Sequence, residues 1–166
     1  MLRLSKLTDY AVVVLVRLSG SGGVQTSPGV AQATGIPEPT VAKVLKMLAA
    51  RGLVASQRGA RGGYRLARPL AEVAIAEVIA AIDGPIALTA CVDGGNIGCD
   101  VLNLCPVRGR WDPVNAAIRE ALSSISLEDM QAASIGRPFQ ILSLARPAIA
   151  SPAAVPASAS SQPIAE

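Results

Sequence analysis

The chain has 166 residues, a length that fits one domain of ordinary size with a short appendage. Hydrophobic residues make up 51% but aromatic residues only 2%, so we expect a core of Ala, Val, Leu and Ile in packed helices. The formal net charge of +3 is too small to identify a nucleic-acid partner by itself. No apolar run approaches the roughly 18 residues of a membrane-spanning helix, and the start lacks the apolar centre of a signal peptide. We therefore expect a cytoplasmic protein without a membrane partner.

The residue types that are missing exclude several functions. The chain has three cysteines and no histidine, which rules out Ser-His-Asp and Cys-His catalysis and mixed Cys/His zinc sites. It has no P-loop and no dinucleotide-binding glycine motif. An odd number of cysteines in a cytosolic chain argues against a disulfide framework. We expect neither an enzyme nor a small-molecule substrate, and the cysteines need another explanation.

The first half of the chain predicts three helices and a hairpin. Apolar residues recur at helical spacing over residues 4–18, and further helices are expected over 28–34 and 40–51. Two short strands, 53–57 and 64–67, flank a glycine-rich turn. The expected caps are Ser5 or Thr8 for the first helix and Ser27, followed by Pro28, for the second; the apolar stripe of the third helix comprises Val41, Val44, Leu45 and Leu48.

The second half predicts three further helices, with a loop between the first and the second. Residues 74–82 resume helical spacing, Pro113 opens a further helix, and Ser126 begins a last one. From about residue 147 the chain is rich in Ala, Pro and Ser, and we expect it to be disordered. The expected division is a winged helix-turn-helix domain (1–84), a cysteine segment (85–110), a dimerisation helix region (111–133) and a C-terminal extension (134–166).

This order of elements predicts a mainly α fold with a small β-hairpin wing, a winged helix-turn-helix that binds double-stranded DNA. Between residues 43 and 68 there are seven basic residues and no acid. The third helix would enter the major groove, while wing arginines reach the minor groove or phosphates. The candidate DNA-binding residues are Thr40, Lys43, Lys46, Arg58, Arg61 and Tyr64.

A simpler interpretation exists for the basic helix face. Lys43 and Lys46 can merely solvate an exposed helix. The basic, glycine-rich hairpin that follows at the right distance favours DNA binding instead.

The three cysteines lie within one loop, as Cys91-x7-Cys99-x5-Cys105. Structural cysteines are usually buried small hydrophobic residues scattered over helices and strands. Thiolates gathered in a loop that also carries Gly, Asp and Asn are soft ligands for an iron–sulfur cluster or for zinc. This spacing is not a general zinc-ribbon or ferredoxin signature, so by itself it does not name the metal.

Three stretches together carry a family resemblance: the opening Met-Leu-Arg-Leu-Ser-Lys-Leu-Thr-Asp-Tyr-Ala, the wing Arg-Gly-Ala-Arg-Gly-Gly-Tyr-Arg-Leu from Arg58, and the three-cysteine loop. They resemble the IscR/NsrR/RirA family of winged-helix iron–sulfur regulators, from residue 1 to about 133. The strings Ala-Leu-Thr-Ala-Cys-Val-Asp from Ala87 and Cys-Pro-Val-Arg-Gly-Arg-Trp-Asp-Pro-Val-Asn from Cys105 look like the branch that regulates the SUF iron–sulfur assembly operon.

The resemblance implies a homodimer on a palindromic operator and a [4Fe-4S] or [2Fe-2S] cluster. It implies a repressor of the SUF operon or of iron homeostasis genes. Some family members complete the ligand set with a histidine shortly after the third cysteine, but Arg108 stands there. Others use an aspartate in the first helix, and Asp9 matches that position. The simpler role of Asp9 is to stabilise the helix N-terminus, and Asp93 and Asp100 are weaker candidates that suit turns.

The helix that Pro113 opens carries an apolar face that is the candidate dimer interface, although an intramolecular core helix would show the same pattern. We expect cluster occupancy to set the spacing of two recognition helices across the dimer. Two alternatives remain: a winged-helix factor with redox thiols or zinc instead of a cluster, and a winged-helix scaffold that binds another protein. The candidate interface residues are Val114, Ala117, Ile118, Leu122 and Ile125.

Overall fold

The computed structural model describes residues 3–59, 61–89, 92, 105–107 and 109–133. Cys91, Cys99 and the stretch expected to be disordered lie outside these residues. Among the described helices, none is long and apolar enough to cross a membrane. The elements are α1 (Lys6–Ser19), α2 (Ser27–Thr34), α3 (Glu38–Ala50), β1 (Val54–Gln57), β2 (Gly63–Leu66), the 3-10 helix η1 (Leu70–Glu72), α4 (Ile75–Ile82), α5 (Asp112–Ser123) and α6 (Leu127–Ala133).

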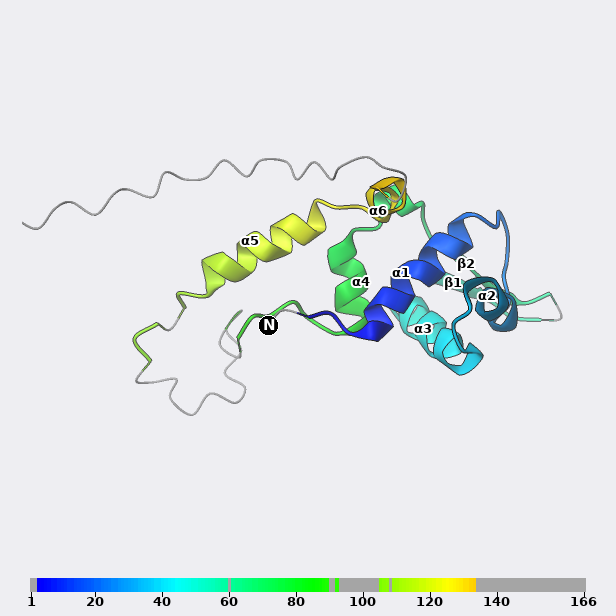
Figure 1. Cartoon of the computed structure of the whole chain (residues 1–166), viewed down its shortest axis with the longest axis horizontal. Coiled ribbons are helices and arrows are strands. Elements are labelled where there is room, and N and C mark those ends of the chain that lie inside the picture. Colours follow the sequence, from blue (N-terminus) through cyan, green and yellow to red (C-terminus); the bar gives the residue numbers. More distant parts are fainter. Residues whose placement is uncertain (1–2, 60, 90–91, 93–104, 108, 134–166) are drawn as a thin grey trace, which may run out of the picture.

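Helix α1 is the centre of the fold, with α2, α3, α4 and β2 packed around it (Figure 1). Its sequence explains its start, because the Ser5 hydroxyl accepts a hydrogen bond from the Thr8 amide at 3.2 Å, as a helix cap should. The predicted stripe of α3 is fully buried against it. The core is aliphatic, as the composition predicted, and includes Ala11, Val14, Leu15, Val41, Val44, Leu45, Leu48 and Val78.

Two helix starts differ from the sequence prediction. The cap of α2 is Thr26, not Ser27, because the Thr26 hydroxyl accepts from the Gly29 amide at 3.2 Å. Helix α3 begins two residues earlier than expected, since Pro37 is its cap and Pro39 lies in the first turn. Proline is tolerated there because the first-turn amides have no partner within the helix.

The wing is an antiparallel hairpin, with Val54 opposite Leu66 and Gln57 opposite Gly63. A segment before α2 extends this sheet, since Tyr64 donates to the Gln25 carbonyl at 2.7 Å and Gln25 donates to the Tyr64 carbonyl at 2.8 Å. The sequence did not predict this pairing of Gln25 with Tyr64. It attaches the wing to the connection between α1 and α2.

Helix α5 projects away from the body formed by α1, α2 and α3, and the chain then returns to it through α6 (Figure 1). The expected cap of α6 is present: the Ser126 hydroxyl accepts from the Asp129 amide, and the Asp129 carboxylate accepts from the Ser126 amide. Leu127 is 0% exposed and lies in the core of the N-terminal helices. The return segment is fixed by Ile75, whose amide donates to the Ile125 carbonyl at 2.9 Å.

The prediction that Ile125 lies on the same helix as the rest of its stripe is wrong. Helix α5 ends at Ser123, with Ser124 as its cap, and the Ser124 hydroxyl donates to the Ala121 carbonyl. Ile125 instead follows the helix and is half-buried against the core. The helical spacing in the sequence continues past the true end of α5, but the bridge between Ala74 and Ser126 competes with a further helical turn.

Candidate DNA interface and cysteine segment

The exposed face of α3 carries the residues predicted to read DNA. Lys43 and Lys46 are exposed and Thr40 is half-buried, on the side opposite the buried stripe. The neighbouring helix is fixed to the start of α3, because the Ser27 hydroxyl donates to the Glu38 carboxylate at 3.4 Å. A helix held at a fixed angle by a second helix, with cations outward, suits the major groove.

The wing presents two more cations. Arg58 and Arg61 are exposed on either side of the turn between β1 and β2. Tyr64 is half-buried and packs against the core, so it also joins the wing to the helices. These placements are compatible with the predicted roles in DNA binding, and those roles stay predictions.

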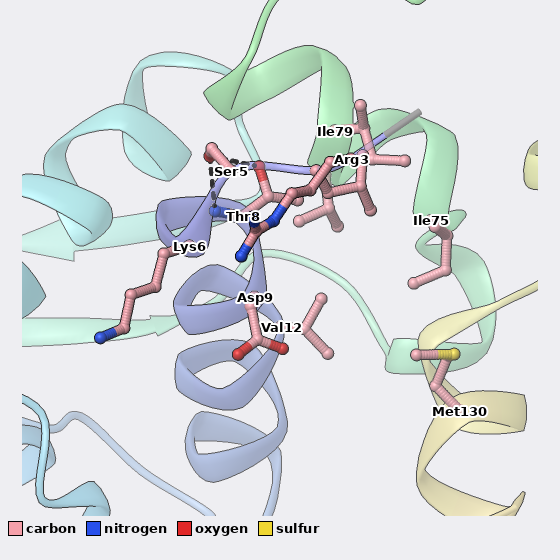
Figure 2. Close-up of a pocket in the computed structure, with 11 residues that line it drawn as sticks. Arg3, Ser5, Lys6, Thr8, Asp9, Val12, Ile75, Ile79 and Met130 are labelled. Atoms are coloured by element: carbon pink, nitrogen blue, oxygen red, sulfur yellow. Dashed lines mark hydrogen bonds between the residues drawn. The ribbon is translucent and has the colours of Figure 1, made fainter. Parts of the chain in front are cut away.

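Asp9 lies in the first turn of α1, at a groove between α1, α4 and α6. This groove has a volume of about 350 Å³. Figure 2 shows Asp9 and Val12 extending from α1 on one side and Met130 of α6 on the other. The Asp9 side chain is exposed. Its carboxylate is therefore accessible to a ligand that approaches from outside this chain's core.

The three cysteines and Asp9 offer thiolate and carboxylate ligands that suit iron or zinc. Cys105 is half-buried and is not in a disulfide within the described part of the chain. Cys91 and Cys99 lie outside the described residues, and in the described residues no three His, Cys, Asp or Glu side chains gather as a metal site would require. Three thiolates with one carboxylate fit an iron–sulfur cluster, whose iron atoms prefer thiolate ligands.

A polar cluster joins the start of α1 to the end of α4. Asp83 accepts hydrogen bonds from the Thr8 hydroxyl at 2.8 Å and from the Ser5 amide at 3.2 Å. Partial burial raises the pKa of Asp83, but the hydrogen bonds from Ser5 and Thr8 outweigh it and hold the pKa below its ordinary value of 3.8. The cluster fixes the point where the chain leaves the helices for the cysteine segment.

A second polar contact joins the start of the cysteine segment to α5, the helix that follows the segment. The Leu88 amide donates to Oδ1 of Asn115 at 3.0 Å, and Nδ2 of Asn115 donates to the Ile86 carbonyl at 3.1 Å. The sequence reasoning missed this residue. A signal was present, because Asn115 interrupts the apolar stripe three positions before Ile118 and seven before Leu122.

The face predicted to form a dimer is only partly covered. Val114 is 45% exposed. Ile118 and Leu122 are half-buried and line a groove of about 630 Å³ between α5, the end of α4 and residues 84–88. Ala117 is exposed. Within the described residues, then, α5 buries little of its own stripe.

Residues 4–133 match the sequence profile of the Rrf2 family, described as iron-dependent transcriptional regulators. The chain belongs to the Rrf2 family. It is 33% identical to the HTH-type transcriptional regulator IscR of Photorhabdus laumondii over 131 residues, covering 78% of this chain and 79% of IscR. It is 34% identical to protein aau3 of Rhizobium meliloti over 124 residues, covering 74% of this chain and 76% of aau3.

Solved structures agree with the family. The T. potens IscR structure matches with 29% identity and a TM-score of 0.56, over 80% of this chain and 88% of that one. CymR, the global cysteine regulator of B. subtilis, matches with 26% identity and a TM-score of 0.61, over 80% of this chain and 98% of CymR. The winged-helix fold and the IscR-like resemblance are confirmed, and the Rrf2 relatives are DNA-binding regulators of transcription rather than enzymes.

Proposed function

We propose that this Rrf2 protein binds a palindromic operator as a homodimer and that an iron–sulfur cluster controls its affinity for that operator. One observation carries the proposal: α1, which bears Asp9, packs directly against α3, which bears Lys43 and Lys46. A change at Asp9, in the first turn of α1, would therefore act on the helix that reads DNA. A role in transcription regulation also supports a cytoplasmic location, since the protein would act where the DNA lies.

Cys91, Cys99 and Cys105 would hold the cluster, with Asp9 as the fourth ligand. The relatives named IscR and the iron-dependent family description support this assignment. When bound, the cluster would supply iron–thiolate bonds that hold the three cysteines together and that oxidants or iron starvation can break. The cysteine residues then fix the path of residues 85–110, and through it the position of α5.

The homodimer would form through α5. The exposed side chain of Val114 and the half-buried Ile118 and Leu122 support this, because a helix of a stable monomer normally buries its apolar stripe. Pairing two copies across a two-fold axis would bury the same stripe and set the distance between two copies of α3. The resemblance supports repression of the SUF operon or of iron homeostasis genes as the output.

Anaerobic native mass spectrometry of the wild type, Cys99→Ala and Asp9→Ala tests the cluster. We expect a wild-type dimer with the mass of a cluster, no cluster in Cys99→Ala, and partial loss in Asp9→Ala because one iron loses its protein ligand. Glu72→Ala, which removes an exposed acid on η1, is the control and should keep the cluster.

Two further measurements, a visible absorption spectrum and an operator-binding assay, separate the alternatives. A colourless protein with one equivalent of zinc would support a zinc-dependent factor instead. Loss of operator binding on changing Arg58 and Lys43 together to Ala is expected; unchanged binding would support a scaffold that binds another protein.

A further inference from the structure

Asn115 is almost completely buried, at 1% exposure, although it lies on a helix whose apolar residues remain partly exposed. Its carboxamide makes both hydrogen bonds to backbone groups of one short stretch, the Leu88 amide and the Ile86 carbonyl. A side chain that pairs with a donor and an acceptor two residues apart fixes the direction of that stretch as well as its distance.

These two hydrogen bonds link positions far apart in the sequence. Leu88 and Asn115 are 27 positions apart, and all three cysteines lie between them. Bringing the ends of such a stretch together reduces the conformational entropy that any ligand of its side chains must overcome. Just before the cysteine segment, Asp83 accepts a hydrogen bond from Thr8, the residue before Asp9.

Packing alone does not explain an asparagine here. A buried amide gains little stability over an apolar side chain of similar size, since its hydrogen bonds only replace those it made with water. An apolar residue would continue the stripe of Ile118 and Leu122. What the amide adds is a defined alignment between α5 and residues 86–88.

We propose that Asn115 is a positioning residue for the cysteine segment: it aligns the entry of that segment with α5, and so slows cluster loss and transmits cluster loss to α5. This inference rests on the proposed function. The amide touches no cysteine in the described residues and acts only through the backbone at Ile86 and Leu88.

The test compares full-length Asn115→Ala and Asn115→Asp with Ala116→Gly. The aspartate keeps the acceptor for the Leu88 amide but, when ionised, has no donor for the Ile86 carbonyl. Ala116 is exposed, so its change to glycine weakens α5 without touching the carboxamide. Two rates are measured: anaerobic release of iron from the cluster to a chelator, and hydrogen exchange of the Leu88 amide in the iron-free protein.

We expect iron release to be about tenfold faster in Asn115→Ala, as loss of hydrogen bonds of ordinary net strength predicts. Asn115→Asp should be intermediate and Ala116→Gly close to the wild type. The Leu88 amide should exchange faster in Asn115→Ala alone. If Asn115→Ala does not fold, iron release that is faster from Asn115→Asp than from Ala116→Gly tests the proposal instead.

Two outcomes are distinguishable. A wild type that holds no iron overturns the proposed function, and an unchanged Leu88 exchange rate then also overturns the positioning role. A wild type that holds a cluster, with equal release from Asn115→Ala and Ala116→Gly, overturns the positioning role alone.

Discussion

The Thr8 hydroxyl donates a hydrogen bond of 2.8 Å to Oδ2 of Asp83, 75 positions further along the chain. Thr8 is 2% exposed and stands beside Asp9 on α1, whereas Asp83 closes α4 immediately before the cysteine segment. The bond thus joins the helix that packs on α3 to the place where residues 85–110 begin. If the cysteine segment responds to a cluster as proposed, this bond would connect it to α1 and, through the packing of α1, to α3.

Removing this bond should destabilise the helices without unfolding them. Thr8→Val keeps the shape of the side chain but leaves Asp83 without its hydroxyl donor, at a cost of about 0.5–1.5 kcal/mol. Urea denaturation at neutral pH measures this difference. A variant as stable as the wild type would show that the bond contributes nothing to the fold.

The contribution of Asp83 to the stability of the folded protein should depend on pH. Its pKa in the folded protein is lowered below the ordinary value of 3.8, so the ionised form stabilises the fold above that pH. The stability is lost as the pH falls through the lowered pKa, because the unfolded chain binds the proton first. In urea denaturation, Asp83→Asn should therefore have a lower free energy of unfolding than the wild type near pH 6. This gap in stability should narrow below pH 3.8. The control Glu72→Gln should show no such gap, and a gap for Asp83→Asn that widened in acid would contradict the assignment.

Lysine substitutions on α3 should weaken binding to all DNA sequences. Each lost phosphate contact lowers the slope of log affinity against log salt concentration by about 0.9. Lys46→Ala, at the predicted phosphate contact, should show this change in fluorescence anisotropy titrations. The control is Arg51→Ala, an exposed cation just past the C-terminal end of α3. Equal slopes for Lys46→Ala and the wild type would remove Lys46 from the interface.

A methyl group on Gly63 should disrupt the wing. A Cβ atom there would lie 2.4 Å from the Gln25 carbonyl oxygen, in the backbone pair that holds the hairpin on the helices. Overpacking of this kind costs about 1–3 kcal/mol, and operator affinity should fall with the wing displaced. Gly23→Ala is the matched control, since a Cβ atom at Gly23 meets nothing within 4 Å. Thermal melts and anisotropy titrations should separate the two variants.

The helices and the hairpin could be predicted because their signals are local. The spacing of Val41, Val44, Leu45 and Leu48 predicts a helix whichever partner buries it. Long-range contacts carry no such signal: the pairing of Gln25 with Tyr64 depends on where the hairpin packs. The predicted end of α5 was wrong for the same reason. Ile125 continues the helical spacing, but its carbonyl accepts a hydrogen bond from the Ile75 amide.

The candidate site was predictable in its residue types more than in its geometry. Cysteine spacing and the exposed lysines follow from the sequence, and α3 carries the lysines as expected. The polar contacts of Asp83 and Asn115 were missed because a lone Asp or Asn predicts a turn or an exposed residue unless the fold brings a partner to it.

A charge on the α5 stripe should separate the proposed dimer. Ile118→Asp places a carboxylate among half-buried apolar side chains, which is costly to cover with a second copy. Analytical ultracentrifugation should show a monomer with weaker operator binding, whereas the control Glu120→Ala, at an exposed position of the same helix, should stay dimeric. A dimeric Ile118→Asp would place the interface elsewhere.

The most direct test of cluster control is one anaerobic sample titrated twice with operator DNA, before and after a chelator removes the iron, with the visible absorption followed throughout. We expect a coloured protein whose operator affinity falls at least about tenfold when the colour is lost, a change that needs only about 1.4 kcal/mol of coupling. A protein that is colourless at the start, or one that binds the operator equally before and after iron removal, would contradict the account.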